Sequence, residues 1–172
     1  ERDGGAPAAG SVPPPDRCAA SDCSVPGSPF SVDPDDPFRQ RWLLSGDSRG
    51  GTPSRTSTAA CTGLGPEVRY ELDLRAFREP VLLYAFLRGD FDGSIRIERG
   101  PSEDPFVVAC NDDHASGARE AFLSLALPPD RYRIVVDGQG AEDAGPFQLT
   151  VELPPPGGRC FRAPPNDRCE AA

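Results

Sequence analysis

The segment EVRYELDL, residues 67–74, alternates apolar and charged side chains with a period of two. Successive side chains of an extended chain point to opposite sides, so this period is typical of a β-strand with one apolar face. Four apolar residues share one face and three charged residues share the other: Val68, Tyr70, Leu72 and Leu74 against Arg69, Glu71 and Asp73. The segment therefore predicts a strand that packs on a core with one face.

Strand-like segments recur on both sides of this one, and residues typical of turns separate them. None of them carries a helical apolar stripe of useful length. About eight short strands spaced about ten residues apart predict an all-β fold, a β-sandwich that is jelly-roll-like. The other expected strands are RWLLSGD at 41–47, VLLYAFLR at 81–88, GSIRIER at 93–99, PFVVAC at 105–110, EAFLSLAL at 120–127, RYRIVVDG at 131–138 and FQLTVEL at 147–153.

Composition divides the 172 residues into a module with Pro-rich extended tails. Residues 1–17 read as a Pro/Gly-rich linker, 18–153 as the β-sandwich module, and 154–172 as a second Pro-rich linker. PPPDRC at 13–18 returns as PPNDRC at 164–169, with five of six positions identical. This return predicts a tandem array in which 154–172 contains the start of a next repeat. Coincidence between two Pro-rich segments is the alternative.

The net charge of −9 excludes several partners. An acidic surface repels nucleic-acid backbones and anionic membranes, so we expect no nucleic-acid binding. No apolar run approaches the roughly 20 residues of a membrane helix, so we expect no membrane insertion. Divalent cations, in contrast, are attracted to such a surface.

Motifs for catalysis are missing. His114 is the single histidine, and no Gly-x-Ser-x-Gly or His-Glu-x-x-His motif is present. A pair of converging carboxylates among the 27 acidic residues is the remaining route to an active site. We expect a chain that is not an enzyme.

The chain contains six cysteines, and their spacing favours disulfides over zinc. Zinc sites use short Cys-x-x-Cys pairs, and none occurs here. An even number of cysteines indicates an oxidising compartment, which predicts a secreted or cell-surface protein. Residues alone leave the connectivity open among Cys18, Cys23, Cys61, Cys110, Cys160 and Cys169.

Two acidic loops flank the strands expected at 93–110. Asp90 and Asp92 precede these strands, and Asn111, Asp112 and Asp113 follow them. If the strands pair antiparallel, both loops lie at the same end of the sheet. Crowded carboxylates call for a cation or a proton, and calcium prefers such oxygen ligands. The alternative is that these residues only cap turns by bonding their own backbone.

The order of several motifs resembles the bacterial pre-peptidase C-terminal domain, a jelly-roll module of secreted proteases and surface repeat proteins. The resemblance covers about residues 16–153, on the scale of one domain. It lies in the segments DRCAA, CTGLGPEVRYELDL, GDFDGSIRIERG, VVACNDDHASG, LPPDRYRIVVDGQG and GPFQLTVEL.

This resemblance implies a secreted, non-catalytic β-sandwich, which in some relatives is a collagen- or polysaccharide-binding calcium module. The matching acidic positions are Asp92, Asn111, Asp112, Asp113 and Asp137. The family pattern has a second cysteine where this chain has GPSEDPF, so Cys110 needs another partner. Cys61 is the candidate, with Cys18–Cys23 and Cys160–Cys169 as local pairs and Cys18–Cys61 as an alternative.

The resulting hypothesis is a non-catalytic structural or adhesive repeat module, stiffened by calcium and disulfides. Its partners are neighbouring copies of the module, arranged in an array or filament, or another surface protein or polysaccharide. A carbohydrate- or protein-binding appendage of a secreted protease is the alternative function.

Overall fold

The computed structural model describes residues 30, 40–53, 57–58, 61–102, 104–113 and 119–155, with the backbone alone at 53, 57–58 and 61–62. Eight strands of six to nine residues make up most of this part. Each coincides with an expected strand to within two residues at either end. They are β1 (Gln40–Asp47), β5 (Pro66–Asp73), β6 (Val81–Gly89), β7 (Gly93–Arg99), β8 (Phe106–Asn111), β9 (Ala121–Leu127), β10 (Arg131–Gly138) and β11 (Pro146–Leu153).

Shorter elements complete the described part of the chain. A 3₁₀ helix, η1 (Ser48–Gly50), follows β1, and Asp47 caps it by accepting a hydrogen bond from the Arg49 backbone N–H. Three two-residue strands are β2 (Thr52–Pro53), β3 (Ser57–Thr58) and β4 (Cys61–Thr62). No helix in the described ranges has the length and apolar character needed to span a membrane.

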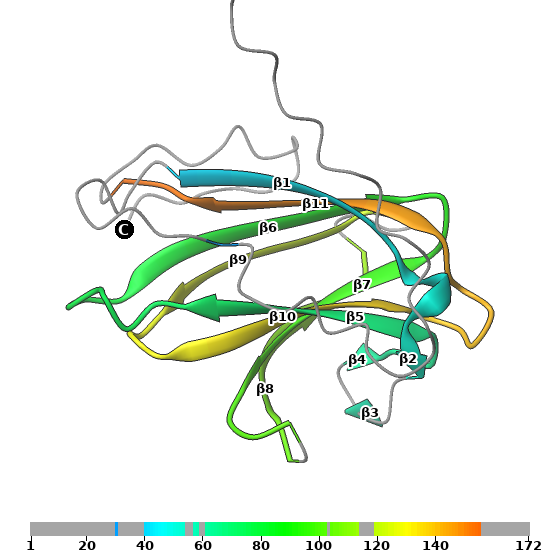
Figure 1. The fold of residues 1–172 in the computed structure, drawn as a ribbon, viewed down its shortest axis with the longest axis horizontal. Coiled ribbons are helices and arrows are strands. Elements are labelled where there is room, and N and C mark those ends of the chain that lie inside the picture. The colour runs from blue at the N-terminus through cyan, green and yellow to red at the C-terminus, as the bar shows by residue number, and fades with distance from the viewer. Residues whose placement is uncertain are drawn as a thin grey trace, which may run out of the picture.

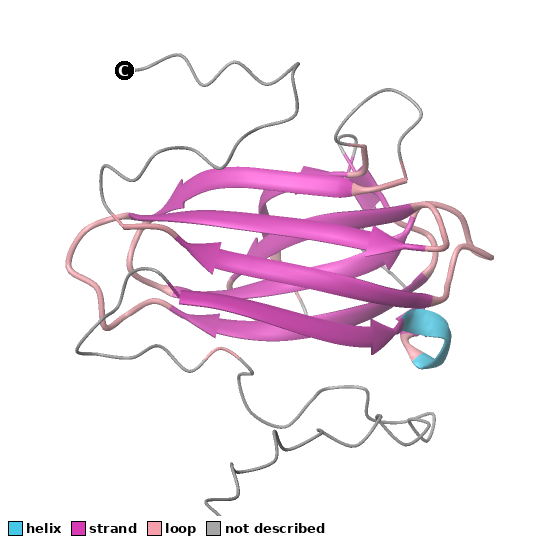
Figure 2. Cartoon of the chain, turned by 90° about the horizontal axis from the view of Figure 1, so that it is seen from above, coloured by secondary structure: helices cyan, strands magenta, loops and turns pink. Residues whose placement is uncertain are grey.

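The long strands form two antiparallel sheets that pack face to face (Figure 1). One sheet has the order β1-β11-β6-β9, and the other has the order β2-β5-β10-β7-β8. Figure 2 looks onto the sandwich from above, with η1 at one end of its strands. The predicted all-β sandwich of eight strands is therefore confirmed.

The strand order is that of a jelly roll. The first half of the chain pairs with the second half in nested antiparallel pairs, β1 with β11, β5 with β10, β6 with β9, and β7 with β8. The first strands of the two sheets follow one another in the chain, as do the last strands, β8 and β9. The sandwich thus has one flank bounded by β1 and β2 and another bounded by β8 and β9.

The apolar faces that alternation predicts meet in one core. Ile95, Ile97, Ile134 and Val136 are completely buried, as expected for facing residues of neighbouring strands. Full burial of such a side chain contributes about 1.5–3 kcal/mol. Trp42 packs against this core and lies edge-on to Phe30, with ring centroids 5.3 Å apart. The other inward-facing sets also match the alternation: Val68, Tyr70, Leu72 and Leu74 on the β5 segment and Phe147, Leu149, Val151 and Leu153 on β11.

Several expectations fall outside the described residues. These are the linker 1–17, residues 156–172 of the second linker, and both copies of the PPxDRC motif. His114, Cys18, Cys23, Cys160 and Cys169 are outside as well. The division into linkers, module and next repeat stays a prediction.

Candidate functional site: an acidic loop cluster and a buried ion-pair cluster

The β7–β8 hairpin brings the two acidic loops to the same end of the sheet. Ile95 of β7 pairs with Asn111 of β8 in antiparallel register. Asp92 comes directly before β7, and Asp112 comes directly after β8. The geometric part of the prediction is therefore confirmed.

Asn111 and Asp112 cap the turn that follows β8. The Asp113 backbone N–H donates to Asn111 Oδ1 at 3.1 Å and to Asp112 Oδ1 at 2.9 Å. Asn111 Nδ2 donates to the Phe122 carbonyl oxygen at 2.8 Å, which ties the turn to β9 in the opposite sheet. These side chains serve the turn chemistry that the sequence predicts, and each still has oxygens with further acceptor capacity.

A third loop, which follows β10, closes over the same end. Gln139 links the other two loops, because its side-chain Nε2 donates to Asp112 Oδ2 at 2.8 Å and its backbone N–H donates to the Asp92 carbonyl oxygen at 2.9 Å. Asp143 Oδ2 accepts from the Gly140 backbone N–H at 2.7 Å. Asp143 of this third loop thus joins the carboxylates of the first two loops. We call Asp92, Asp112, Asp113 and Asp143 the acidic loop cluster.

The carboxyl of Asp92 lies in an unfavourable electrostatic environment within the acidic loop cluster. Burial raises the pKa of its carboxyl, and the negative charges of Asp113, Asp143 and Asp112 raise it further, while Arg119 opposes the shift. Asp92 Oδ1 is buried and has no hydrogen-bond partner within the described part of the chain. A charged carboxylate in this position is costly unless a cation or a proton accompanies it.

Asp90 lies at the rim of the acidic loop cluster. Its side chain is exposed, and its carbonyl oxygen accepts a long hydrogen bond of 3.4 Å from Arg119 Nη1. Arg119 thus places one positive charge beside the carboxylates. Hard oxygens of this kind suit calcium. In the described ranges, however, no three side chains of His, Cys, Asp or Glu come close enough together to hold a metal ion.

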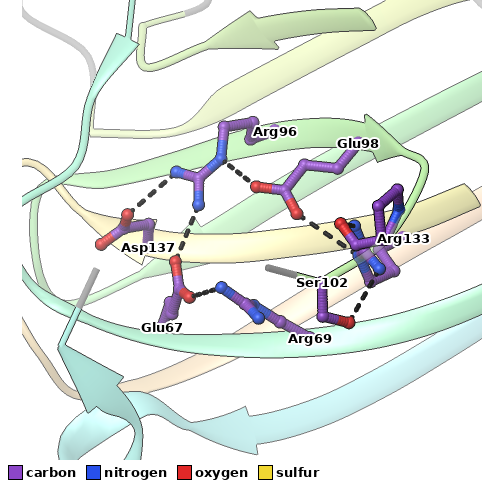
Figure 3. A network of polar contacts seen from close by, with 8 residues as sticks. Glu67, Arg69, Arg96, Glu98, Ser102, Arg133 and Asp137 are labelled. Carbon is purple, nitrogen blue, oxygen red and sulfur yellow. Dashed lines mark hydrogen bonds and ion pairs between the residues drawn. The ribbon is translucent and has the colours of Figure 1, made fainter. Parts of the chain in front are cut away.

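Asp137, the sixth residue of the predicted calcium site, has a different role. It is completely buried on β10, and its Oδ2 accepts a hydrogen bond of 3.0 Å from Arg96 Nη1. Arg96 lies on β7, also completely buried, and points away from the core between the two sheets (Figure 3). The positive partner of Asp137 is therefore a guanidinium of the protein itself.

Each nitrogen of the Arg96 guanidinium contacts a different carboxylate (Figure 3). In addition to Asp137, Nε donates to Glu98 at 2.8 Å and Nη2 donates to Glu67 at 2.7 Å. These three carboxylates come from β10, β7 and β5. Charge-assisted hydrogen bonds in this fork geometry are among the strongest that side chains form.

Two further arginines balance the negative charge. Arg133 contacts Glu98 and donates to Ser102 Oγ at 3.0 Å, and Arg69 forms an ion pair with Glu67 (Figure 3). We call the six residues the Arg96 cluster: Arg69, Arg96, Arg133, Glu67, Glu98 and Asp137. With three charges of each sign, it is neutral as a unit.

A glycine-rich segment lies against one end of the Arg96 cluster. A Cβ on Gly63 would lie 1.8 Å from Asp137 Oδ2, so no other residue fits there without a shift. The Leu64 and Gly65 backbone N–H groups both donate to the Gly138 carbonyl oxygen at 3.1 Å. The sequence did not predict this cluster, because alternation places Arg96 and Glu98 on the face opposite the core without showing that this face is covered. The i, i+2 spacing of opposite charges, in Glu67-x-Arg69 and Arg96-x-Glu98, was the available signal.

Cys110 lies beside the Arg96 cluster. It pairs with Arg96 in the β7–β8 register, and it is disulfide-bonded. Cys61 is in β4, but its side chain is outside the described residues. The Cys61–Cys110 pairing stays a prediction.

Comparison with known families, curated proteins and solved structures gives distant structural likenesses alone. No family model and no curated protein matches the sequence. Among solved structures, a mitogen from Yersinia pseudotuberculosis matches with a TM-score of 0.43 and 11% identity, over 67% of this chain and 87% of the other. PliG of Aeromonas hydrophila, a periplasmic inhibitor of g-type lysozyme, matches with a TM-score of 0.40 and 11% identity, over 67% of this chain and 86% of the other. Matches this distant carry no function over, and the resemblance to the pre-peptidase C-terminal domain has no support beyond its motifs and the all-β fold.

Proposed function

We propose that this chain is a non-catalytic, extracellular structural or adhesive module whose loops are stiffened by calcium and whose fold is stapled by disulfides. The eight-stranded jelly roll supports this role because the inward-facing apolar side chains of its two sheets pack into one core. The charged side chains that are fully buried are paired within the Arg96 cluster, which is neutral and holds strands together. That arrangement serves rigidity.

One observation carries the calcium part of the proposal, namely the buried Asp92 Oδ1 with no hydrogen-bond partner in the described ranges. The neighbouring charges of Asp112, Asp113 and Asp143 raise the cost of keeping Asp92 ionised. A divalent cation removes that cost because it supplies charge and accepts several oxygen ligands at once. Its ligands would be the carboxylates of Asp92, Asp112 and Asp113, which would have to draw closer together than they lie in the structure, with Asn111 and Asp90 at the rim. Asp137 is not needed, since Arg96 already neutralises it.

Thermal unfolding of the non-reduced protein, with calcium and with excess chelator, tests this proposal. At a calcium concentration 100 times the dissociation constant, the fold should gain about 2.7 kcal/mol. The gain should vanish in Asp92→Asn and persist in Asp104→Asn, a matched change at an exposed acidic residue before β8. Equal melting temperatures in calcium and chelator would remove calcium from the proposal and leave turn capping as the role of these residues.

A binding role is the second candidate, and one aromatic group favours it. On the outer face of the four-stranded sheet, the half-buried Phe86 pairs with the half-buried Phe122 in register, and the buried Tyr84 stacks on Phe122 with ring centroids 6.0 Å apart. Aromatic faces of this kind suit apolar or ring-shaped ligands. Co-sedimentation with insoluble polysaccharides that is lost in Phe122→Ala would support the appendage function. A catalytic domain encoded upstream would favour it further.

A further inference from the structure

The edge strand β8 lacks the charged residues and prolines that often protect a sheet edge. It is the last strand in the order β2-β5-β10-β7-β8, and β7 is its sole partner among the described strands. Its sequence, FVVACN, contains no charged residue, proline or glycine. Natural edges usually carry a lysine or a proline, because an open row of backbone N–H and C=O groups pairs readily with another chain.

Two large apolar side chains of β8 lie in solvent. Phe106 is 70% exposed and Val108 is 37% exposed. Ile97 pairs with Ala109 and Glu98 pairs with Val107, so Val108 is an extra residue that forms a β-bulge. The bulge turns Val108 outward instead of pairing it with β7. A partner strand on this edge would cover both side chains.

The opposite flank of the sandwich has a matching edge. β1 is the first strand in the order β1-β11-β6-β9, and within the described residues it pairs with β11 alone. Its Leu43 is 62% exposed. β1 and β8 lie far apart in the fold, one at the top and the other at the bottom of the view in Figure 1.

The charges at the two edges are complementary. Asp112 and Asp113 follow the C-terminal end of β8, and the exposed Arg41 lies near the N-terminal end of β1. Antiparallel pairing of these two edges brings those ends together.

Pairing of β8 with a second β8 is less favourable. In an antiparallel pair of identical strands, Asp112 of one copy faces the Asp104 end of the other. Like charges that face each other across strands are destabilising. Charge therefore favours a partner edge that begins with a basic residue.

We propose that β8 pairs antiparallel with β1 of a second copy of this chain. The two edges lie on opposite flanks, so the contact is head-to-tail and leaves one edge of each kind open at the ends of every assembly. Repetition then produces a linear array. This inference deepens the proposed structural role and rests on it, but it does not depend on calcium.

Sedimentation velocity of the full chain in chelator tests the contact. We expect the unaltered protein to form species larger than dimers as its concentration rises. Val108→Lys blocks the β8 edge and Leu43→Lys blocks the β1 edge, so each variant alone should stay monomeric. An equimolar mixture should form dimers and stop there, because one intact β8 edge meets one intact β1 edge, while the two lysine-bearing edges repel each other.

Three results would overturn the contact: an unaltered protein that stays monomeric at every concentration, a Leu43→Lys variant that assembles like the unaltered protein, or a mixture that stays monomeric. Both substitutions are at exposed positions, and each variant should keep the melting temperature of the monomer. If Val108→Lys melts early, Phe106→Lys replaces it, since Phe106 is the more exposed residue. Because the runs contain chelator, a failed calcium experiment leaves their outcome unaffected.

Discussion

Arg96 and Asp137 lie 41 residues apart in the chain and are both completely buried, and the Arg96 Nη1 group donates a hydrogen bond of 3.0 Å to Asp137 Oδ2. The contact joins β7 to β10 on the side of the sheet that faces away from the sandwich core. A charged side chain on such a face is usually solvated, whereas Arg96 and Asp137 are excluded from solvent. Burying a charge is costly unless it is paired and hydrogen-bonded, so the three carboxylates around Arg96 depend on it.

Replacement of Arg96 should therefore be severe. Arg96→Met leaves Glu67, Glu98 and Asp137 buried without their shared cation, and we expect a loss of about 3–5 kcal/mol in the free energy of unfolding. Urea denaturation measures the loss. Arg99→Met is the matched control on the same strand, since its side chain is 53% exposed and its ion pair with Asp130 should contribute at most about 1 kcal/mol. Similar losses for the two variants would show that the buried carboxylates do not depend on Arg96.

Gly63 should not tolerate a side chain. Gly63→Ala places a methyl group 1.8 Å from Asp137 Oδ2, so the backbone or the Arg96 cluster has to move. Overpacking of this kind costs about 1–3 kcal/mol. The neighbouring Leu64→Ala, at a position that is 57% exposed, should change stability by about 0.5 kcal/mol or less. Chemical denaturation of both variants measures these changes in stability. If Gly63→Ala leaves the stability unchanged, the segment around Gly63 shifts without cost.

The pH dependence of the protein in chelator should carry the signature of Asp92. Its pKa is raised in the folded state, mainly by burial, so the folded protein holds this proton more tightly than the unfolded chain. Stability from this group is then greatest at low pH and declines as pH rises from the unfolded pKa through the folded pKa. Asp92→Asn removes the penalty. In chelator it should be more stable than the unaltered protein at neutral pH, with a difference that shrinks toward acid pH.

Asp73 supplies a control of opposite sign. Hydrogen bonds from Arg75 lower the pKa of the Asp73 carboxyl in the folded state. Its contribution is present above the unfolded pKa and is lost as pH falls toward the folded pKa. Asp73→Asn should therefore be less stable than the unaltered protein at neutral pH by a small amount, because the pair is exposed. If both variants change stability in the same direction at neutral pH, the raised pKa of Asp92 is not the cause.

A disulfide between Cys61 and Cys110 predicts non-additive losses. Cys110→Ser removes a disulfide at the edge of the Arg96 cluster and should cost about 2–4 kcal/mol. If Cys61 is the partner, Cys61→Ser should cost a similar amount and the double variant no more than either single one. Thermal unfolding under non-reducing conditions measures all three. Losses that add in the double variant would assign Cys110 to another cysteine.

Much of the fold follows from local pattern. The period of two in EVRYELDL and in RYRIVVDG fixes which side chains of β5 and β10 face the core, because the geometry of an extended chain leaves no other choice. Turn residues between the segments set the strand lengths. The position of Asp92 and Asp112 at one end of the β7–β8 hairpin was equally accessible, since it requires antiparallel pairing alone.

The candidate site was less accessible, because its partners come from distant strands. Asp137 looked like a ligand next to other acids, and only the approach of β7 to β10 gives it Arg96 instead. Asp143 lies close enough to Asp92 to affect its pKa, and this proximity depends on the conformation of the loop after β10, which the local sequence does not predict. Gly63 carries no local signal of its close approach to Asp137.

The sequence by itself determined the strands, their apolar faces and the sandwich, because these depend on alternation and turn chemistry within about ten residues of chain. The tertiary structure alone decided which charges are buried and what neutralises them. Those outcomes depend on how closely distant strands and loops approach, and electrostatic energies change steeply with distance and with exclusion of water.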